Sequence, residues 1–254
     1  MAGILLTGAL GKMGRTLCAQ VLTIEDLEVV AGVDIVSSDD CSFPIFSSFD
    51  AIDSAVIEKI DVIIDFSNPA ALSNLLAFAV KHSLPAVIAT TGLSDEQIAS
   101  LHLAAEKIPV FFSANMSLGV NLLCELAKKA AAALGADFDI EIVEMHHNQK
   151  IDAPSGTALM LADAVAGELD YDAQYEYNRH EKREKRTKTE IGIHSLRGGT
   201  VTGEHQVVFA GNDEIITLSH SARSKALFST GALNAARFLT KKQPGMYCMA
   251  DLID

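Results

Sequence analysis

Short apolar runs alternate with stretches of helical hydrophobic spacing along the first half of the chain. The apolar runs predict buried strands over residues 3–7, 27–34, 61–66, 85–90 and 109–112. The helical spacing predicts helices over residues 15–24, 69–82 and 95–107, the last capped by Ser94. Strands that alternate with helices in this way form parallel β-α-β units. The pattern therefore predicts an α/β fold with a Rossmann-like, doubly wound parallel sheet.

The pattern changes after residue 117. Helices are predicted over residues 117–134, 155–169 and 225–239. Alternating apolar and polar positions predict strands over residues 137–146, 191–196, 205–210 and 214–221. Residues 211–213, Gly-Asn-Asp, are typical of a hairpin turn between the last two strands. We therefore expect a second, α+β domain with a mixed or antiparallel sheet covered by helices. Residues 171–188 predict a polar loop, and residues 243–254 a short tail.

A glycine-rich turn follows the first predicted strand and opens the first predicted helix. Gly8, Gly11 and Gly14 differ from the common G-x-G-x-x-G spacing because the middle glycine comes later. Glycines let the backbone approach a pyrophosphate, whose charge the start of a helix attracts. Asp34, at the end of the second strand, is placed to accept hydrogen bonds from an adenosine ribose. The alternative is that the glycines serve only the packing of the turn. The preceding strand, the following helix and the acidic residue after the second strand together favour dinucleotide binding.

Two observations bear on which dinucleotide binds. Ile35, rather than an arginine, follows Asp34, so no cation there matches a 2′-phosphate. The sequence therefore predicts NADH or NADPH, with NADH at least as good. The alternative stays open that Lys12, in the glycine turn, attracts the 2′-phosphate of NADPH.

Residues 89–92 and 113–116 follow two later strands, at the strand ends where ligands of open α/β sheets lie. The alternative is that both segments are plain turns without a ligand.

Residues 144–158, E-M-H-H-N-Q-K-I-D-A-P-S-G-T-A, concentrate the most chemistry in the chain. The imidazoles of His146 and His147 can transfer protons near neutral pH, and Lys150 adds a cation. Residues 155–157, Ser-Gly-Thr, open a helix whose first amides can bind an anion. The segment predicts a small acidic substrate and proton-coupled chemistry. The alternative is that His146 and His147 are surface residues without a role in the chemistry. A metal is not predicted, because neighbours on a strand face opposite sides and no third ligand is suitably spaced.

Composition narrows the class of protein. The formal net charge of the 254 residues is −13, which excludes a nucleic-acid role because phosphate binding needs a basic surface. No apolar run is long enough to span a membrane, and the start of the chain lacks the basic region of a signal peptide. The four cysteines are scattered, which fits a cytoplasmic protein with reduced thiols. Residues 179–188 form a basic run, expected to be solvated, with a substrate-cleft lining as the alternative.

The chain resembles the dihydrodipicolinate reductase (4-hydroxy-tetrahydrodipicolinate reductase) family. The most specific block is residues 144–158, with its His-His, Lys and Ser-Gly-Thr positions. Further blocks, in the same order as in the family, lie at residues 8–14, 65–67, 90–92, 114–121 and 197–205. Ala89 departs from the usual glycine of the family, and Ile35 and Asn68 stand where some members carry arginine. The resemblance extends over essentially the whole chain.

The resemblance implies an enzyme of lysine and diaminopimelate biosynthesis that reduces a cyclic dicarboxylate with NADH or NADPH. It implies a dinucleotide-binding domain of residues 1–117 and 224–254, and a substrate-binding domain of residues 118–223 whose sheet builds a homotetramer. His146 would be the general acid and Lys150 the second catalytic residue, and how they share the chemistry stays open. The implied substrate contacts are His147, Ser155, Gly156 and Thr157. The implied cofactor contacts are Gly8, Ala9, Leu10, Gly11, Lys12, Met13, Asp34, Ala89, Thr90, Thr91, Ser113, Ala114, Asn115 and Met116.

Two other functions fit part of the sequence. Another two-domain NAD(P) dehydrogenase, for instance one acting on amino acids, explains the glycine turn but not residues 155–157 after the two histidines. A nucleotide-sensing regulator without turnover would keep the glycine turn and Asp34 but would not need His146 and Lys150. Fold alone does not choose among these functions, because function is decided by the site.

Overall fold

The computed structural model describes residues 1–36, 38 and 41–253. These residues form two compact units, and each is described by itself. The first unit consists of Met1–Ser117 and Ala226–Asp254, and the second of Leu118–Lys225. The last residue of the predicted tail, Asp254, lies outside the described residues.

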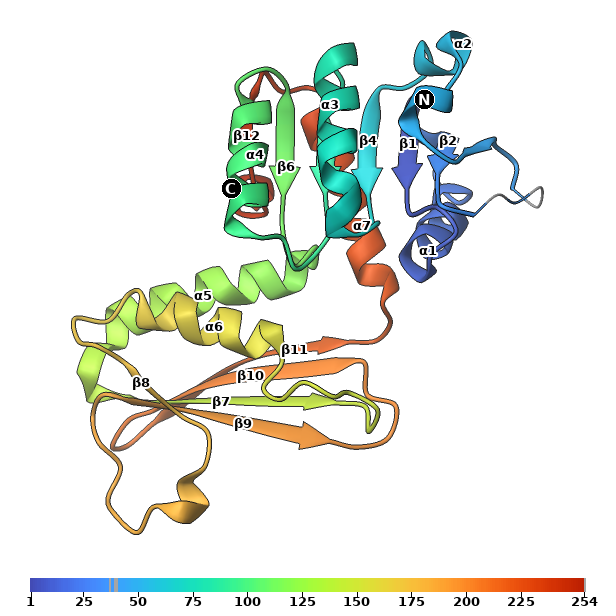
Figure 1. Cartoon of the computed structure of the whole chain (residues 1–254). Coiled ribbons are helices and arrows are strands. Elements are labelled where there is room, and N and C mark those ends of the chain that lie inside the picture. Colours follow the sequence, from blue (N-terminus) through green and yellow to red (C-terminus); the bar gives the residue numbers. More distant parts are fainter. Residues whose placement is uncertain (37, 39–40, 254) are drawn as a thin grey trace. The chain divides into compact units, whose positions relative to one another are not determined.

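A parallel sheet forms the centre of the first unit (Figure 1). Its strands are β1 (Ala2–Thr7), β2 (Leu27–Val33), β3 (Ile45–Phe46), β4 (Val62–Asp65), β5 (Ala86–Ile88), β6 (Pro109–Phe112) and β12 (Gly245–Tyr247). Their order in the sheet is β12-β6-β5-β4-β1-β2-β3, and every neighbouring pair is parallel. This is the doubly wound order, which reverses direction between β1 and β4. The predicted Rossmann-like sheet is confirmed.

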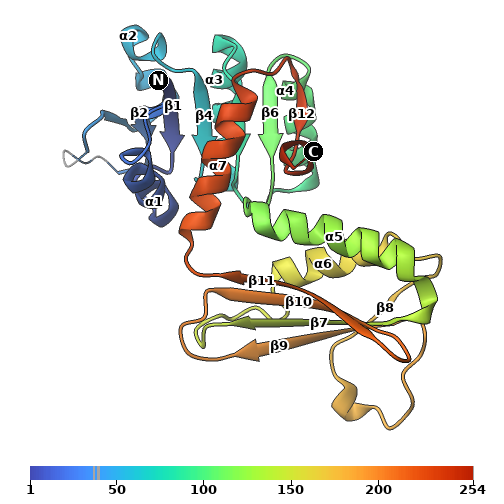
Figure 2. The same cartoon turned by 180° about the vertical axis from the view of Figure 1, so that it is seen from behind.

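Helices cover both faces of this sheet, which explains why its central strands are continuous apolar runs. The helices are α1 (Lys12–Val21), α2 (Ser54–Ile57), α3 (Leu72–His82), α4 (Asp95–Ala105) and α7 (Ala226–Leu239). Figure 1 shows α3 and α4 in front of the sheet, and Figure 2 shows α1 and α7 on the opposite face. The side chains of Leu5, Ile63 and Val87 are fully buried between these layers. The predicted cap of α4 is present, since the Ser94 hydroxyl accepts a hydrogen bond from the Gln97 amide.

Two strands and one α-helix of the first unit lie where no strand or helix was predicted. They are β3, α2 and β12, each only two to four residues long. Such short segments carry no periodicity to detect, and the two strands are held by backbone pairing with β2 and β6. The short tail predicted over residues 243–254 contains β12, which extends the edge of the sheet.

The second unit is a five-stranded mixed sheet with its long helices on one face (Figure 1). The helices are α5 (Leu118–Leu134) and α6 (Gly156–Ala166). The strands are β7 (Asp139–His146), β8 (Gln174–Glu176), β9 (Glu190–Arg197), β10 (Gly203–Ala210) and β11 (Ile215–Ala222). The order is β11-β10-β7-β9-β8, antiparallel on the β10 side of β7 and parallel on the β9 side. The mixed sheet and the hairpin between β10 and β11 are confirmed.

The strict alternation of β7 is reproduced by its burial. Ile140 and Ile142 are buried against α5 and α6, while Asp139, Glu141 and Val143 face the other side and are only half-buried. Glu144 and His146 fall on the buried face although both are polar. Buried polar groups need partners, so these two positions point to a functional cluster at the end of β7.

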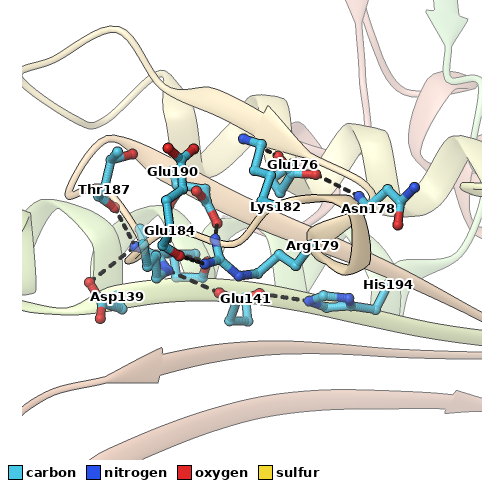
Figure 3. Close-up of polar contacts among 12 residues, drawn as sticks. Asp139, Glu141, Glu176, Asn178, Arg179, Lys182, Glu184, Thr187, Glu190 and His194 are labelled. Atoms are coloured by element: carbon cyan, nitrogen blue, oxygen red, sulfur yellow. Dashed lines mark hydrogen bonds and ion pairs between the residues drawn. The ribbon is translucent and has the colours of Figure 1, made fainter.

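The basic run is held by carboxylates and is not a free loop. Arg179 pairs with Glu190, and Lys182 pairs with Glu176 of β8 (Figure 3). Arg186 bonds Glu141 at 3.0 Å and Asp139 at 3.0 Å. The prediction of a loop over residues 171–188 is wrong for β8, whereas the basic run is largely exposed, as expected, and three of its cations form ion pairs.

The alternative, that the run lines a substrate cleft, also has to be corrected for Arg186. Its guanidinium additionally donates to the Ile140 carbonyl at 2.8 Å, so it is fixed at the start of β7. His146 ends the same strand, about 15–20 Å away at the usual rise of a strand. Arg186 therefore stabilises the sheet at the end opposite to His146.

Candidate active site

The glycine turn after β1 requires glycine at its first and last positions. Gly8 has a φ of +71°, and a Cβ there would lie 2.5 Å from the Phe66 carbonyl oxygen. A Cβ on Gly14 would lie 2.3 Å from the Gly8 carbonyl oxygen. The Gly11 amide closes the turn by donating to the same oxygen at 3.1 Å, and α1 then begins at Lys12. The turn thus brings backbone and helix start together, as an anion site requires.

Asp34 is tied to the glycine turn. The Leu10 amide donates to its Oδ2 at 2.9 Å, which fixes the carboxylate at the end of β2 beside the turn. One carboxylate oxygen therefore has a structural role in addition to any ribose contact. The side chain of the following residue, Ile35, is 91% exposed.

A cavity of about 1040 Å³ lies over this turn. Its lining includes Gly8, Leu10, Gly11 and Asp34 from the predicted cofactor set, together with Arg15. The volume is at the upper end of the range for small-molecule sites, which suits a ligand as large as a dinucleotide. Ala9, Lys12 and Met13 are outside this lining; Ala9 is buried, whereas Lys12 is exposed.

A buried carboxylate joins the strand ends next to the cavity. Asp65, the last residue of β4, is fully buried. Its Oδ1 accepts hydrogen bonds from the Thr7 hydroxyl at 2.5 Å, the Ser67 hydroxyl at 2.5 Å and the Ser67 amide at 3.1 Å. Its Oδ2 accepts from the Thr90 hydroxyl at 2.7 Å. Asp65 thus links β1, β4 and the residues after β5 at the point where the strand order reverses. It was not among the predicted site residues.

The other predicted cofactor residues lie after β5 and β6. Ala89 and Thr90 are buried and Thr91 is exposed. After β6, the Ser113 hydroxyl donates to the Asn115 carbonyl at 2.8 Å, and the Asn115 amide donates back to that hydroxyl at 3.2 Å. Ala114 is exposed and Met116 is buried. None of these residues lines the cavity described above, so they form a second group at the carboxyl ends of the strands.

In the second unit, the register of three strands gathers polar side chains on one buried face. Glu144 of β7 lies opposite Ser195 of β9 and opposite His205 of β10. Two residues along, His146 lies opposite Arg197. Residues two apart on a strand share a face, so these side chains form one cluster at the end of the sheet.

Glu144 is the centre of this cluster and is fully buried. Its Oε2 lies 2.6 Å from His146 Nδ1 and accepts from Arg197 at 2.9 Å. Its Oε1 accepts from Arg197 at 2.8 Å and from the Ser155 amide at 3.2 Å. The carboxylate thus orients the imidazole, receives a two-pronged guanidinium contact and holds the start of α6.

The environment shifts the pKa values of both partners. Burial alone would raise the pKa of the Glu144 carboxyl, but hydrogen bonds from Arg197, His146 and Ser195 lower it from 4.5 to about 2. Burial lowers the pKa of His146 below 6.5, although the bond to Glu144 opposes that shift. Without a ligand, the His146 imidazole is mostly neutral at pH 7.

Arg197 and Lys150 hold the turn between β7 and α6. Arg197 donates to the Asp152 carbonyl at 2.6 Å, and Lys150 Nζ lies 2.9 Å from Asp152 Oδ2. The turn contains a cis peptide bond between Ala153 and Pro154. Burial is the main cause of the lowered pKa of His146, and the positive charges of Lys150 and Arg197 lower it further.

The Ser-Gly-Thr positions begin α6. Ser155 is its N-cap, and its hydroxyl accepts a hydrogen bond from the Ala158 amide at 3.2 Å. Ser155 is buried, Gly156 is exposed, and Thr157 and His147 are half-buried. The structure therefore brings His146 and Ser155 together through Glu144, with Lys150 in the adjoining turn.

Sequence reasoning missed three members of this cluster as site residues. Glu144 was named only as the first residue of the 144–158 block, and Arg197 and His205 only as parts of another family block. The sequence did contain a signal for Glu144, because it lies two residues before His146 on the same strand and therefore shares its face of the sheet. No comparable signal exists for Arg197 and His205, since the pairing of β7 with β9 and β10 cannot be read from the order of residues.

Two further observations concern residues 1–36, 38 and 41–253, the part of the chain that the structure describes. No group of three or more His, Cys, Asp or Glu side chains is arranged to hold a metal ion in that part of the chain. Within the same residues, no helix has the length and apolar character needed to cross a membrane.

Two family models match this chain. The model described as "Dihydrodipicolinate reductase, N-terminus" matches residues 2–116, and the one described as "Dihydrodipicolinate reductase, C-terminus" matches residues 119–253. This chain belongs to the dihydrodipicolinate reductase family. The predicted family is thereby confirmed, and the alternatives of an amino-acid dehydrogenase and a nucleotide-sensing regulator are set aside.

Individual members of the dihydrodipicolinate reductase family are similar over their full length. The chain is 49% identical to the 4-hydroxy-tetrahydrodipicolinate reductase of Caldanaerobacter subterraneus subsp. tengcongensis, over 100% of this chain and 98% of that protein. It is 45% identical to the enzyme of the same name from Clostridium tetani, over 98% of this chain and 96% of that protein. Among solved structures, dipicolinate-bound dihydrodipicolinate reductase from Paenisporosarcina sp. TG-14 matches with a TM-score of 0.82 at 27% identity, covering 98% of this chain and 97% of that chain.

The buried Glu144 carboxylate makes the second unit sensitive to acid. Its folded pKa lies below its ordinary value, so it stabilises the fold above pH 4.5 and loses that contribution as pH falls toward 2. The shift corresponds to about 3 kcal/mol. In urea titrations at pH 6, 4 and 3, Glu144→Gln should be the less stable protein at pH 6, and its deficit should shrink at lower pH.

Glu106→Gln, which removes an exposed carboxylate at the end of α4, is the matched control for loss of charge. Its free energy of unfolding should run parallel to that of the unmodified protein. A deficit of Glu144→Gln that is the same at pH 6 and pH 3 would contradict the role given to the buried carboxylate.

Proposed function

We propose that this protein reduces 4-hydroxy-tetrahydrodipicolinate (dihydrodipicolinate) to tetrahydrodipicolinate in lysine and diaminopimelate biosynthesis, using NADH or NADPH. The observation that carries the proposal is the buried Glu144–His146 pair, with Nδ1 and Oε2 2.6 Å apart, beside the Ser155 cap. A fold or a dinucleotide site alone would not require this pair. The 4-hydroxy-tetrahydrodipicolinate reductases to which the chain is similar support the substrate assignment.

The proposed dinucleotide-binding domain consists of residues 1–117 and 224–254, which contain the first unit. The amides at the start of α1 would hold the pyrophosphate, and Asp34 would accept from the adenosine ribose through the oxygen that Leu10 does not use. The residues after β5 and β6, which are Ala89, Thr90, Thr91, Ser113, Ala114, Asn115 and Met116, would contact the nicotinamide end. When bound, the nicotinamide supplies a hydride.

The proposed substrate-binding domain consists of residues 118–223, which lie within the second unit. Lys150 and the half-buried His147 would bind one carboxylate of the dipicolinate ring system. The hydroxyls of Ser155 and Thr157 and the amides at Gly156 would bind the other, because a helix start attracts negative charge. The dipicolinate bound in the similar Paenisporosarcina structure supports a small aromatic dicarboxylate as a ligand.

His146 is the proposed proton donor. Its Nδ1 is occupied by Glu144, so Nε2 is the nitrogen left to give a proton to the substrate. Gly203 lies beside this nitrogen, and a Cβ there would stand 3.1 Å from Nε2. The glycine therefore keeps space in front of the donor. When hydride enters a conjugated imine, the electron density left on the ring requires a proton, and an imidazolium can deliver it.

The lowered pKa of His146 makes proton supply depend on the substrate. The free imidazole is mostly neutral at pH 7. A bound dianion would favour the charged form, because an opposite charge within a few ångströms raises the pKa of an imidazole. Glu144 keeps Nδ1–H pointed inward and stabilises the cation, while Lys150 neutralises the carboxylate of the ligand and counters charge on the ring.

We also propose a homotetramer built through the sheet of the second unit and a cytoplasmic location. The face of this sheet turned away from α5 and α6 carries Val143, Leu196 and Val208, and the Leu196 side chain is 51% exposed. That partly apolar face supports the assembly. The cysteines Cys18, Cys41, Cys124 and Cys248 are all free, which supports a reducing compartment.

The function is tested by oxidation of NADH or NADPH when the condensation product of pyruvate and aspartate semialdehyde is supplied. His146→Gln should lower kcat by about 100-fold or more, the range that acid catalysis supplies. His102→Gln, on the exposed face of α4, is the control and should keep full activity. Full activity of His146→Gln would remove His146 as the proton donor, and no turnover by the unmodified protein would remove the function itself.

Cofactor preference is tested at Asp34. Its carboxylate would repel a 2′-phosphate, so NADH should be used at least as well as NADPH. Asp34→Asn removes the charge and keeps an oxygen for the Leu10 amide. The ratio of kcat/KM for NADPH to that for NADH should rise by about tenfold, equivalent to about 1.4 kcal/mol. An unchanged ratio in steady-state kinetics with both cofactors would show that Asp34 does not read the ribose.

A further inference from the structure

His205 is a buried imidazole that the proposed chemistry does not use. It lies on β10 opposite Glu144 and is 4% exposed. Its Nε2 is 3.0 Å from the hydroxyl oxygen of Ser155. Its ring stands edge-on to His146, with 5.2 Å between ring centroids. His205 therefore contacts Ser155, a proposed substrate-binding residue, and His146, the proposed proton donor.

The surroundings of His205 determine where its proton lies. Nδ1 is buried and has no hydrogen-bond partner among the described residues. A buried N–H without an acceptor is rarer and more costly than a buried lone pair, so the proton belongs on Nε2. Burial, with a smaller effect of the His146 charge, lowers the pKa of His205 to about 4. The ring is therefore neutral near pH 7 and donates from Nε2 to Ser155.

The Ser155 hydroxyl oxygen then has both acceptor positions filled. The Ala158 amide donates to it at 3.2 Å as part of the helix cap, and His205 Nε2–H donates at 3.0 Å. The hydroxyl hydrogen is the remaining hydrogen-bonding group of Ser155. If His205 carried its proton on Nδ1, the hydroxyl would instead donate to Nε2 and would offer no proton to a ligand.

We propose that His205 is a positioning residue that keeps the Ser155 hydroxyl as a donor to a substrate carboxylate. This inference rests on the proposed function, in which Ser155 binds the dicarboxylate. A hydroxyl whose lone pairs are already engaged cannot reorient toward a neighbouring amide, so it is prepared to donate to an anion before the ligand arrives.

The protonation state is measurable without any substrate. In protein labelled with ¹⁵N-histidine, the signals of His205, assigned by their loss in His205→Gln, should report a neutral ring with the proton on Nε2 at pH 7. A proton on Nδ1, or a charged ring, would overturn the proposal. This result stands whether or not the proposed reduction is correct.

Kinetics test the consequence for binding. His205→Leu should raise the KM for the dicarboxylate substrate by about tenfold, as expected for a lost hydrogen bond to a charged group, with little change in kcat. His205→Gln, whose side-chain amide can replace Nε2–H, should restore much of the affinity. His102→Leu is the matched control, because His102 lies on the exposed face of α4 and should leave KM within about twofold.

A double variant separates positioning from general damage to the fold. If His205 acts through the Ser155 hydroxyl, adding His205→Leu to Ser155→Ala should cause little further rise in KM. Multiplying effects, or a His205→Gln variant as impaired as His205→Leu, would overturn the proposal. If His205→Leu does not fold, the comparison of His205→Gln with the unmodified protein and the ¹⁵N signals still decides it.

Discussion

A fully buried carboxylate at the end of β7 organises the second unit. Glu144 has no access to water, so its charge must be balanced by the protein. Arg197 balances it from the neighbouring strand, His146 from the same strand and the Ser155 amide from the start of α6. Loss of Glu144 would leave the guanidinium without its counter-charge and the imidazole without its orientation. The strand end and the helix start are therefore fixed by one ionised group.

The first unit also contains a buried carboxylate that accepts several hydrogen bonds, at the point between β1 and β4 where the strand order reverses. Asp65 collects hydrogen bonds from Thr7, Ser67 and Thr90, which come from three different strand ends. The three hydroxyls donate to the Asp65 carboxylate, and these hydrogen bonds hold the strand ends in place. In each unit, a buried carboxylate holds the neighbouring backbone in place, as the ligand contacts proposed for the glycine-turn amides and the α6 amides require.

Much of the fold follows from the sequence because the central elements are long and periodic. The continuous apolar runs of β1 and β4 reflect burial on both sides, and the alternation of β7 reflects burial on one side. By contrast, β3, β8 and β12 are two or three residues long, and their pairing depends on neighbours distant in the chain. The hydrophobic pattern of so short a segment does not indicate which strand it pairs with.

The candidate site divides in the same way. The glycine turn and the Ser155 cap are local structures, so residue spacing predicts them. The contacts of Glu144 with Arg197, and of Ser155 with His205, join residues 53 and 50 positions apart. They depend on which strands pair and in what register, so they emerge only with the folded sheet. The lowered pKa of His146 likewise results from burial that the order of residues does not display.

The central claim is that Glu144 supports the protonated form of His146 as the proton donor. The pH dependence of kcat/KM, which reports the free enzyme, tests it most directly when the unmodified protein and Glu144→Gln are compared on the same substrate. A required acid makes kcat/KM fall as pH rises through the pKa of His146, which lies below 6.5. Removing the carboxylate lowers that pKa further, because Glu144 raises it, so the fall should occur at a lower pH in Glu144→Gln. A fall at the same pH in both proteins would contradict the claim.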